Sequence, residues 1–254
     1  APLSLLAKVL ITYTDGTTEW VVTDKSWMTA RTGPVLSGDI YQGEAYDATA
    51  DVSYRENGYD TSSWLSANIQ TVSATVTARN GGSIYVRDDL ERHAQKVVVY
   101  ETVENAVADT QYGKIVPLAT YGDEAFELKA GQRAVVDLGQ NAAGWEKFTV
   151  SAARGTEILV RHAEMLNDNN GLYSRGNDGP EGSVYTANLR NAPAKTVYIC
   201  SGNGQETYHP TVTYYGFRYL EITTSADITV HKVSGETLTS ITKEQDSGTF
   251  TSSS

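Results

Sequence analysis

Apolar and polar residues alternate with a period of two along much of this chain. Successive side chains of a strand point to opposite faces, so this alternation is typical of strands that cover a core with one face. The clearest examples are the segments AKVLITYT, KVVVYETV, RAVVDLG, EKFTVSA, TEILVRHAE, KTVYIC, FRYLEIT and DITVHKV. Turn sequences such as TDGT and GNG separate them, and their Gly residues supply the positive φ that hairpins need. The pattern predicts an all-β chain built from sandwiches.

The stretch VVDLGQNAAGWEKF, residues 135–148, interrupts two apolar runs with amides and glycines. We expect two strands joined by a tight corner, in which Gly139 and Gly144 allow the bend and Trp145 restarts the pairing. The amides of Gln140 and Asn141 would satisfy backbone groups that a corner leaves unpaired. Architecture is the favoured interpretation, and a contact surface for substrate or for another domain is the alternative.

The segment TEILVRHAE combines residues that resemble catalytic groups. Alternation predicts that Ile158, Val160, His162 and Glu164 share one face, and that Leu159 and Arg161 lie on the other. A nucleophilic triad needs a Ser or Cys within reach of the His, and the sequence offers no such partner. The four His residues are scattered without metal-ligand spacing. A structural role is therefore favoured for this segment.

A long aromatic segment, residues 208–222, reads as one strand. We expect the odd-numbered residues from Tyr215 to Tyr219 on one face and the even-numbered residues from Arg218 to Ile222 on the other. Such a stripe is usually core, although an exposed aromatic row would stack on sugar rings. Short helices are expected only at TSSWLSA and at RDDLERHAQ, residues 87–95.

Composition narrows the function. The 254 residues contain 20 Lys and Arg against 31 Asp and Glu, for a net charge of -11. This charge repels phosphate backbones and anionic lipids, so nucleic acid is an improbable partner. No apolar run approaches the roughly 20 residues that span a bilayer. Cys200 is the only cysteine, and its setting in VYIC predicts a small buried hydrophobe rather than a nucleophile.

A cluster of carboxylates occurs in GDIYQGEAYDATAD. Asp39, Glu44, Asp47 and Asp51 lie within thirteen residues of one another, with Tyr and Gly between them. Hard cations such as Ca²⁺ need several oxygens at once, and carboxylates near a Gly turn can provide them. Alternatively, Glu44 and Asp47 accept hydrogen bonds from turn amides or an Arg and pin a corner of the sandwich. The spacing does not match an EF-hand loop, so the sequence leaves both interpretations open.

Three blocks of the chain carry a family resemblance. They are GPVLSGDIYQGEAYDA at 33–48, preceded by VTDKSW; DLGQNAAGW followed by GTEILVRHAEML; and GNGQETYHPTVTYYGFRYLEI at 202–222. In this order they resemble the N-terminal part of bacterial α-L-rhamnosidases, glycoside hydrolase family 78. The resemblance covers nearly the whole chain. It implies two consecutive antiparallel β-sandwich domains of jelly-roll or concanavalin-like type, followed in the family by an (α/α) barrel with the carboxylates of an inverting glycosidase.

The resemblance also sets expectations for domains and catalysis. We expect a first sandwich over 1–112, truncated at its N-terminus, a second over 113–233, and a linker beginning at 234–254. The family's catalytic acids lie downstream of a junction like SGTFTSSS, where this chain ends. No residue here is therefore expected to be catalytic, and the chain alone is not expected to be an enzyme. The parent would be a glycosidase exported from the cell.

Sugar binding is the remaining expectation. Some sandwich domains that resemble the first half of the chain bind terminal L-rhamnose with the help of calcium. The resemblance then implies Asp39, Glu44 and Asp47 as metal ligands, with Asp39 and Glu44 also reaching the sugar. Tyr41, Tyr46 and Trp64 are the candidate aromatic platforms. The partners would be a rhamnose-containing glycan and the parent's own catalytic domain. A dedicated calcium-dependent rhamnose lectin or an adhesin-type surface domain is the alternative.

Overall fold

A computed structural model describes residues 4–71, 73, 75–77, 81–105, 112–168 and 176–252 of the chain. Strands and connecting loops make up these residues, with only short 3₁₀ turns between them. The prediction of an all-β chain is confirmed. Within the described residues, no helix is long and apolar enough to cross a membrane. Close contacts divide the chain into two compact units, which are described separately below.

Unit 1 comprises residues 1–33 and 51–81. Its strands are β1 (Lys8–Thr12), β2 (Thr18–Val22), β3 (Met28–Thr29) and β6 (Leu65–Ser66), and the 3₁₀ turn η1 spans Ser53–Arg55. β1 and β2 form an antiparallel hairpin, while β3 pairs with β6. The TDGT turn closes the hairpin with Gly16 at a φ of 83°. No side chain among the described residues of unit 1 is classed as buried.

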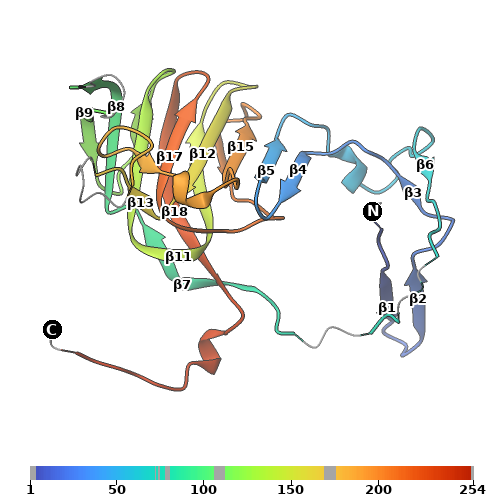
Figure 1. Ribbon diagram of the computed structural model, residues 1–254. Coiled ribbons are helices and arrows are strands. Elements are labelled where there is room, and N and C mark those ends of the chain that lie inside the picture. The colour runs from blue at the N-terminus through green and yellow to red at the C-terminus, as the bar shows by residue number, and fades with distance from the viewer. Residues whose placement is uncertain are drawn as a thin grey trace. The chain divides into compact units, whose positions relative to one another are not determined.

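Unit 2 comprises residues 34–50 and 82–254. Its strands are β4 (Val35–Asp39), β5 (Gly43–Asp47), β7 (Tyr85–His93), β8 (Lys96–Glu104), β9 (Lys114–Tyr121), β10 (Phe126–Leu128), β11 (Arg133–Ser151), β12 (Glu157–Ala163), β13 (Met165–Leu166), β14 (Val184–Tyr185), β15 (Lys195–Ile199), β16 (Gln205–Tyr208), β17 (Tyr215–Thr224) and β18 (Ile228–Thr239). The turns η3 (Ala187–Leu189) and η4 (Lys243–Gln245) are 3₁₀. Figure 1 labels most of these elements.

The long strand β11 takes part in both layers of unit 2. Its first half pairs with β8 and β17, and from β17 the sheet continues through β12, β15, β5 and β4. Its second half pairs with β16 and β18, and β18 also pairs with β7 and β10. Most pairings are antiparallel, whereas β15 and β5 run parallel. β11 therefore links the two sheets of the sandwich (Figure 1).

The amide- and glycine-rich stretch is a bend within β11 rather than a turn between two strands. The register of β11 against β17 shifts between Asp137 and Ala142, which marks a β-bulge. Gly139 has a φ of 80°, a conformation that side chains with a Cβ rarely adopt. A Cβ on Gly144 would lie 1.9 Å from the carbonyl oxygen of Glu236 in β18. Both glycines thus have structural roles in the bend, and Gly144 lets two backbones approach closely.

The main core lies between the two layers of unit 2. Its fully buried members include Val136 of β11, Val160 of β12, Leu220 of β17 and Phe148. A smaller cluster lies on the other face of the first sheet, where Tyr100, Val135 and Val184 pack together. For convenience, this second face is called the outer face. The first sheet is therefore covered on both sides over part of its area.

Two local predictions fail. Residues 87–93 of the expected helix RDDLERHAQ lie in strand β7, because the backbone of this strand pairs with β18, from Arg87 opposite Thr237 to His93 opposite Ser234. The expected alternation of the aromatic strand is also wrong. Tyr215 and Phe217 face the main core, but so do Leu220 and Ile222, so the parity changes between Phe217 and Leu220. The change occurs opposite the bulge in β11, which the residue pattern does not reveal.

The contacts also show where the expected domain limits fall. The limit near residue 112 lies between β8 and β9, which pair with each other inside unit 2. Residues 234–239, expected to begin a linker, complete β18 and pair with β7. Farther on, buried Arg87 of β7 donates hydrogen bonds to the carbonyl oxygen of Ile241 and to the carboxylate of Asp246. The segment as far as Asp246 is thus tied to unit 2.

Candidate functional site

Glu44 is a buried structural acceptor. It lies in β5 and is 2% exposed. One carboxylate oxygen accepts the hydroxyl of Tyr208 at 2.6 Å, and the other accepts the backbone amides of Thr211 and Val212, each at 2.8 Å. Burial, followed by this hydrogen bond, raises the pKa of Tyr208 far above its usual range, so the hydroxyl stays protonated and donates. Glu44 therefore joins β5 to the segment between β16 and β17.

Asp39 and Asp47 cap local turns. One oxygen of Asp39 accepts the amides of Tyr41 and Gln42, and these hydrogen bonds lower the pKa of the Asp39 carboxyl. One oxygen of Asp47 accepts the amide of Thr49. Of the two interpretations of the carboxylate cluster, hydrogen bonding to turn amides is the one that these contacts match.

These carboxylates do not form a cation site in the structure. Within the described ranges, no group of three or more His, Cys, Asp or Glu side chains is placed so that it could hold a metal ion. Glu44 is already satisfied by three donors from its own unit, and Ca²⁺ needs six or more oxygens. The residues expected to bind calcium thus do not fit the ion in this arrangement.

The three expected aromatic platforms have different environments. Tyr41 is 65% exposed at the β4–β5 connection of unit 2. Tyr46 packs inside the same unit, with its ring centroid 5.2 Å from that of Tyr208. Trp64 belongs to unit 1 and lies about equally far from two tyrosine rings, 6.2 Å from Tyr54 and 5.9 Å from Tyr59. Tyr41 is thus the exposed member, and Tyr46 serves the core.

His162 pairs with Glu146 in the main core of unit 2. Its Nε2 lies 2.7 Å from a carboxylate oxygen of Glu146, and its Nδ1 lies 2.8 Å from the carbonyl oxygen of Ala194. A carbonyl only accepts, so Nδ1 carries a proton. The ring also stacks on Tyr215 at 3.6 Å. These contacts bury His162 and use both of its ring nitrogens within unit 2, as the structural interpretation of this segment expects.

Cys200 is buried, as the sequence predicts. Burial raises the pKa of its thiol to about 12. The thiolate is the reactive form of cysteine, so this side chain is inert at neutral pH.

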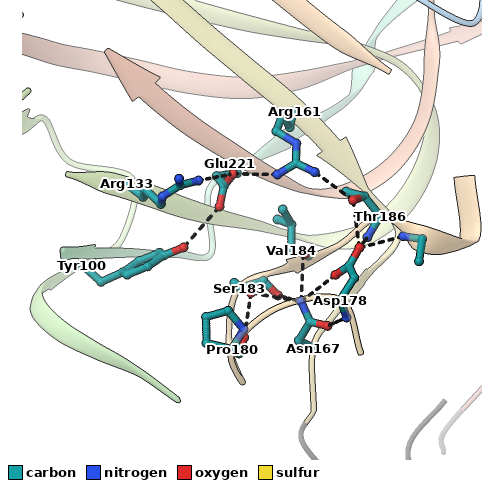
Figure 2. Close-up of polar contacts among 11 residues, drawn as sticks. Tyr100, Arg133, Arg161, Asn167, Asp178, Pro180, Ser183, Val184, Thr186 and Glu221 are labelled. Atoms are coloured by element: carbon teal, nitrogen blue, oxygen red, sulfur yellow. Dashed lines mark hydrogen bonds and ion pairs between the residues drawn. The ribbon is translucent and has the colours of Figure 1, made fainter. Parts of the chain in front are cut away.

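A polar pocket opens on the outer face of the first sheet. Figure 2 shows Glu221 of β17 between Arg133 of β11 and Arg161 of β12. One oxygen of Glu221 accepts from both guanidinium groups, at 3.0 and 3.2 Å, and the other accepts the hydroxyl of Tyr100 at 3.2 Å. The other residues that line the pocket are Gly131, Gln132, Leu159, Thr223 and Thr224. Arg133 and Arg161 are both partly exposed, whereas Glu221 is buried.

A hydrogen-bonded framework borders this pocket. Arg161 donates to the hydroxyl of Thr186, which in turn donates to Asp178. Asp178 exchanges hydrogen bonds with the side chain of buried Asn167, and this amide also donates to the carbonyl oxygen of Val184 (Figure 2). Residues 169–175, between Asn167 and Asp178, lie outside the described residues. The framework holds the described residues on both sides of this gap against the sheet.

Sequence reasoning placed only part of this pocket. It put Leu159 and Arg161 together on the face of β12 that points away from the main core, and the structure confirms this. It did not connect them with Arg133 or Glu221, which are far away in the sequence. The available signal was a charged residue in each of three apolar strands, since an ionised side chain in a half-buried strand needs a partner.

Fold and pocket together define a β-sandwich protein whose buried carboxylates, among them Glu44, Glu146 and Glu221, serve as internal hydrogen-bond acceptors. Comparison with known protein families identifies the family of this β-sandwich protein. A model of the α-L-rhamnosidase N-terminal domain matches residues 1–88, and a model of the bacterial α-L-rhamnosidase concanavalin-like domain matches residues 128–241. The chain therefore belongs to the bacterial α-L-rhamnosidase family, and the resemblance found in the sequence is confirmed.

Individual relatives support the same family assignment. An α-L-rhamnosidase of Streptomyces avermitilis is 33% identical over 223 residues, which cover 87% of this chain and 17% of the relative. An α-L-rhamnosidase of Alteromonas sp. is 28% identical over 222 residues, which cover 87% of this chain and 20% of the relative. The crystal structure of the S. avermitilis enzyme complexed with L-rhamnose superposes with a TM-score of 0.62 at 30% identity, over 90% of this chain and 19% of that one. The chain thus spans about a fifth or less of the length of these relatives.

Proposed function

We propose that this chain is a non-catalytic β-sandwich portion of an inverting α-L-rhamnosidase and that it supports the catalytic domain of that enzyme. Two domain models of the family match it in order, and its relatives are several times longer. The observation that carries the proposal is that the buried carboxylates of the chain are engaged in internal hydrogen bonds. Buried Glu44, Glu146 and Glu221 each bind groups of their own unit, whereas a glycosidase needs two carboxyl groups that face a sugar linkage.

The test is hydrolysis of p-nitrophenyl α-L-rhamnoside by the purified chain. We expect no release of p-nitrophenol above the buffer rate, under conditions in which a complete α-L-rhamnosidase is active. Turnover by the chain that survives repurification would overturn the proposal. The proposal gives Glu44 no chemical role. Glu44→Gln should therefore show the same absence of turnover as the unsubstituted chain, and turnover that this substitution removes would assign a catalytic role to Glu44.

A second function, binding of terminal L-rhamnose, is favoured by one specific observation. The S. avermitilis relative has been crystallised in complex with L-rhamnose. In this chain, exposed Tyr41 and the Trp64 cluster of unit 1 are the aromatic surfaces that suit an apolar sugar face. We propose binding without a calcium ion held by Asp39, Glu44 and Asp47, because their carboxylates already accept backbone or hydroxyl hydrogens.

Calorimetry with L-rhamnose, with and without EDTA, tests this second function. We expect heat of binding that EDTA leaves unchanged and that one of the two substitutions removes, Tyr41→Ala if unit 2 binds the sugar and Trp64→Ala if unit 1 does. Tyr214→Ala, at a tyrosine that is also exposed in unit 2, is the matched control. Heat that EDTA abolishes would restore the calcium interpretation, and absence of heat in the unsubstituted chain would leave only the supporting role.

A further inference from the structure

The outer-face pocket carries an unbalanced positive charge. Its lining contains two guanidinium groups, of Arg133 and Arg161, and a single carboxylate, of Glu221. Both guanidinium groups donate to the same oxygen of Glu221. The protein as a whole has a net charge of -11, so a concave surface with the opposite sign is a local feature of this sheet. An anionic ligand would balance it.

The hydrogen bonds leave a specific edge of Arg133 for such a ligand. Arg133 donates to Glu221 through Nη1, whereas Arg161 uses Nη1 for Glu221 and Nη2 for Thr186. The Nε–Nη2 edge of Arg133 has the fork geometry that matches a carboxylate. The same edge of Arg218 holds both oxygens of Asp137 at 2.8 Å elsewhere in unit 2. The side chain of Arg133 is 47% exposed, and no hydrogen bond among the described residues uses its Nε–Nη2 edge.

The rest of the pocket suits a sugar ring. Thr223 of β17 lies opposite both Arg133 of β11 and Leu159 of β12 in the register of the sheet. An apolar side chain and a hydroxyl thus lie next to the guanidinium group, and Thr224 extends the polar edge. A sugar with an apolar ring face, hydroxyl groups and one carboxylate matches this set of contacts. Glu221, which is buried in the sheet, accepts hydrogen bonds from both arginines and so fixes their positions.

We propose that this pocket binds a uronic acid residue of a glycan, with the carboxylate on the Nε–Nη2 edge of Arg133 and the ring over Leu159 and Thr223. Arg161 is the second positive charge that stabilises the bound anion. The site goes beyond the proposed rhamnose binding, since it recognises a charge that rhamnose lacks.

The experiment compares two probes, the methyl glycoside of galacturonic acid and its neutral methyl ester, by titration of the ¹⁵N-labelled chain. The acid is expected to shift amides of β11, β12 and β17 around the pocket. The ester should bind about tenfold more weakly or not at all, because it loses a charge-assisted hydrogen-bond pair. Added salt should weaken binding of the acid and not of the ester.

Substitutions locate the site. Arg133→Gln should weaken binding of the acid by about tenfold or more, and Arg133→Lys should weaken it less, because Lys keeps the charge but not the fork. Arg55→Gln, at an exposed arginine of unit 1, is the matched control and should have no effect. Circular dichroism of each variant verifies the fold.

Four outcomes would overturn the proposal: no shifts with the acid, shifts confined to amides away from the three strands, equal affinity for acid and ester, or unchanged affinity in Arg133→Gln. None of these results bears on rhamnoside hydrolysis or on rhamnose binding, which use different probes. Failure of this inference is therefore distinguishable from failure of the proposed function.

Discussion

The β1–β2 hairpin of unit 1 and the β11–β17 pair of unit 2 are similar in sequence and different in surroundings. Both are rich in β-branched and other apolar residues. Leu10 and Trp20 in the hairpin are 48% and 52% exposed, whereas Val136 and Leu220 in unit 2 are fully buried. Every buried apolar side chain of the described residues belongs to unit 2. The difference teaches that strand-forming residues specify a strand, while burial of their side chains depends on whether a second layer covers that strand.

The energetic consequence follows from the same comparison. Complete burial of a Leu or Val side chain contributes about 1.5–3 kcal/mol relative to exposure. Unit 2 collects this contribution at many positions, and in unit 1 the strands are held by backbone hydrogen bonds and local turns. A two-stranded hairpin without a covered face is only marginally stable in water. We therefore expect unit 2 to determine the folding stability of the chain.

The largest expected effect is that of Leu220→Ala in the centre of β17. The substitution removes a side chain that is fully buried in the main core and should lower the free energy of unfolding by about 2–5 kcal/mol. Leu10→Ala in β1 is the matched change at an exposed strand position and should cost well under about 1 kcal/mol. Urea unfolding followed by tryptophan fluorescence measures both. Equal costs would contradict the comparison between the units.

A second substitution tests the close approach of β11 and β18. Gly144→Ala places a Cβ against the carbonyl of Glu236 and should destabilise unit 2 by about 1–3 kcal/mol through backbone displacement. Gly248→Ala is the control, because the added Cβ meets no atom within 4 Å. Thermal unfolding of the two variants gives the difference. A Gly144→Ala variant as stable as the control would show that the bend in β11 tolerates a side chain.

A third pair distinguishes a structural carboxylate from a metal ligand. Glu44→Gln should lower the free energy of unfolding by about 1–2 kcal/mol, because the amide cannot accept all three hydrogens that the carboxylate accepts. Asp39→Asn keeps an oxygen for its two turn amides and should leave the unfolding midpoint nearly unchanged. Both midpoints should be the same in calcium and in EDTA. A calcium-dependent midpoint that Glu44→Gln abolishes would argue for a bound ion.

The smallest expected effect is a pH dependence that arises at Glu206. Burial works to raise the pKa of this carboxyl, but hydrogen bonds from the amides of Ser201 and Gly202 and from Tyr198 together lower it below its usual 4.5. A lowered folded-state pKa stabilises the fold above about pH 4.5, and that stabilisation is lost as the pH falls through the folded value. Glu206→Gln should flatten the stability profile below pH 5. An unchanged profile in the variant would assign the acid sensitivity to other carboxylates.

Much of the fold could be predicted from the chain. Alternation located the strands around Val136, Val160 and Ile222, and the family blocks indicated both domain types. The prediction failed where pairing overrides local preference. Residues 87–93 have a helix-like sequence but complete the edge of a sheet through β18. The facing of β17 also reverses where its register against β11 shifts, between Asp137 and Ala142 of β11, and the residue pattern does not reveal this irregularity.

The candidate sites show the same limit. The carboxylate cluster around Glu44 was visible as a run of acidic residues, but the amides of Thr211 and Val212 that occupy Glu44 are far away in the sequence. The pocket of Arg133, Arg161 and Glu221, by contrast, is not visible as a cluster in the sequence. Its members are isolated charges in three separate strands, and only the order β11–β17–β12 brings them together. Residue type suggests which chemistry is available, while strand order decides which residues meet.

Hydrogen exchange of the backbone amides at neutral pH tests the central claim most directly, namely that unit 2 alone holds the stable core and the candidate pocket. We expect amides in the centres of β11, β12 and β17 to exchange only through global unfolding, and amides of β1 and β2 to exchange orders of magnitude faster through local opening. Protection of the β1–β2 hairpin equal to that of β17 would contradict the account.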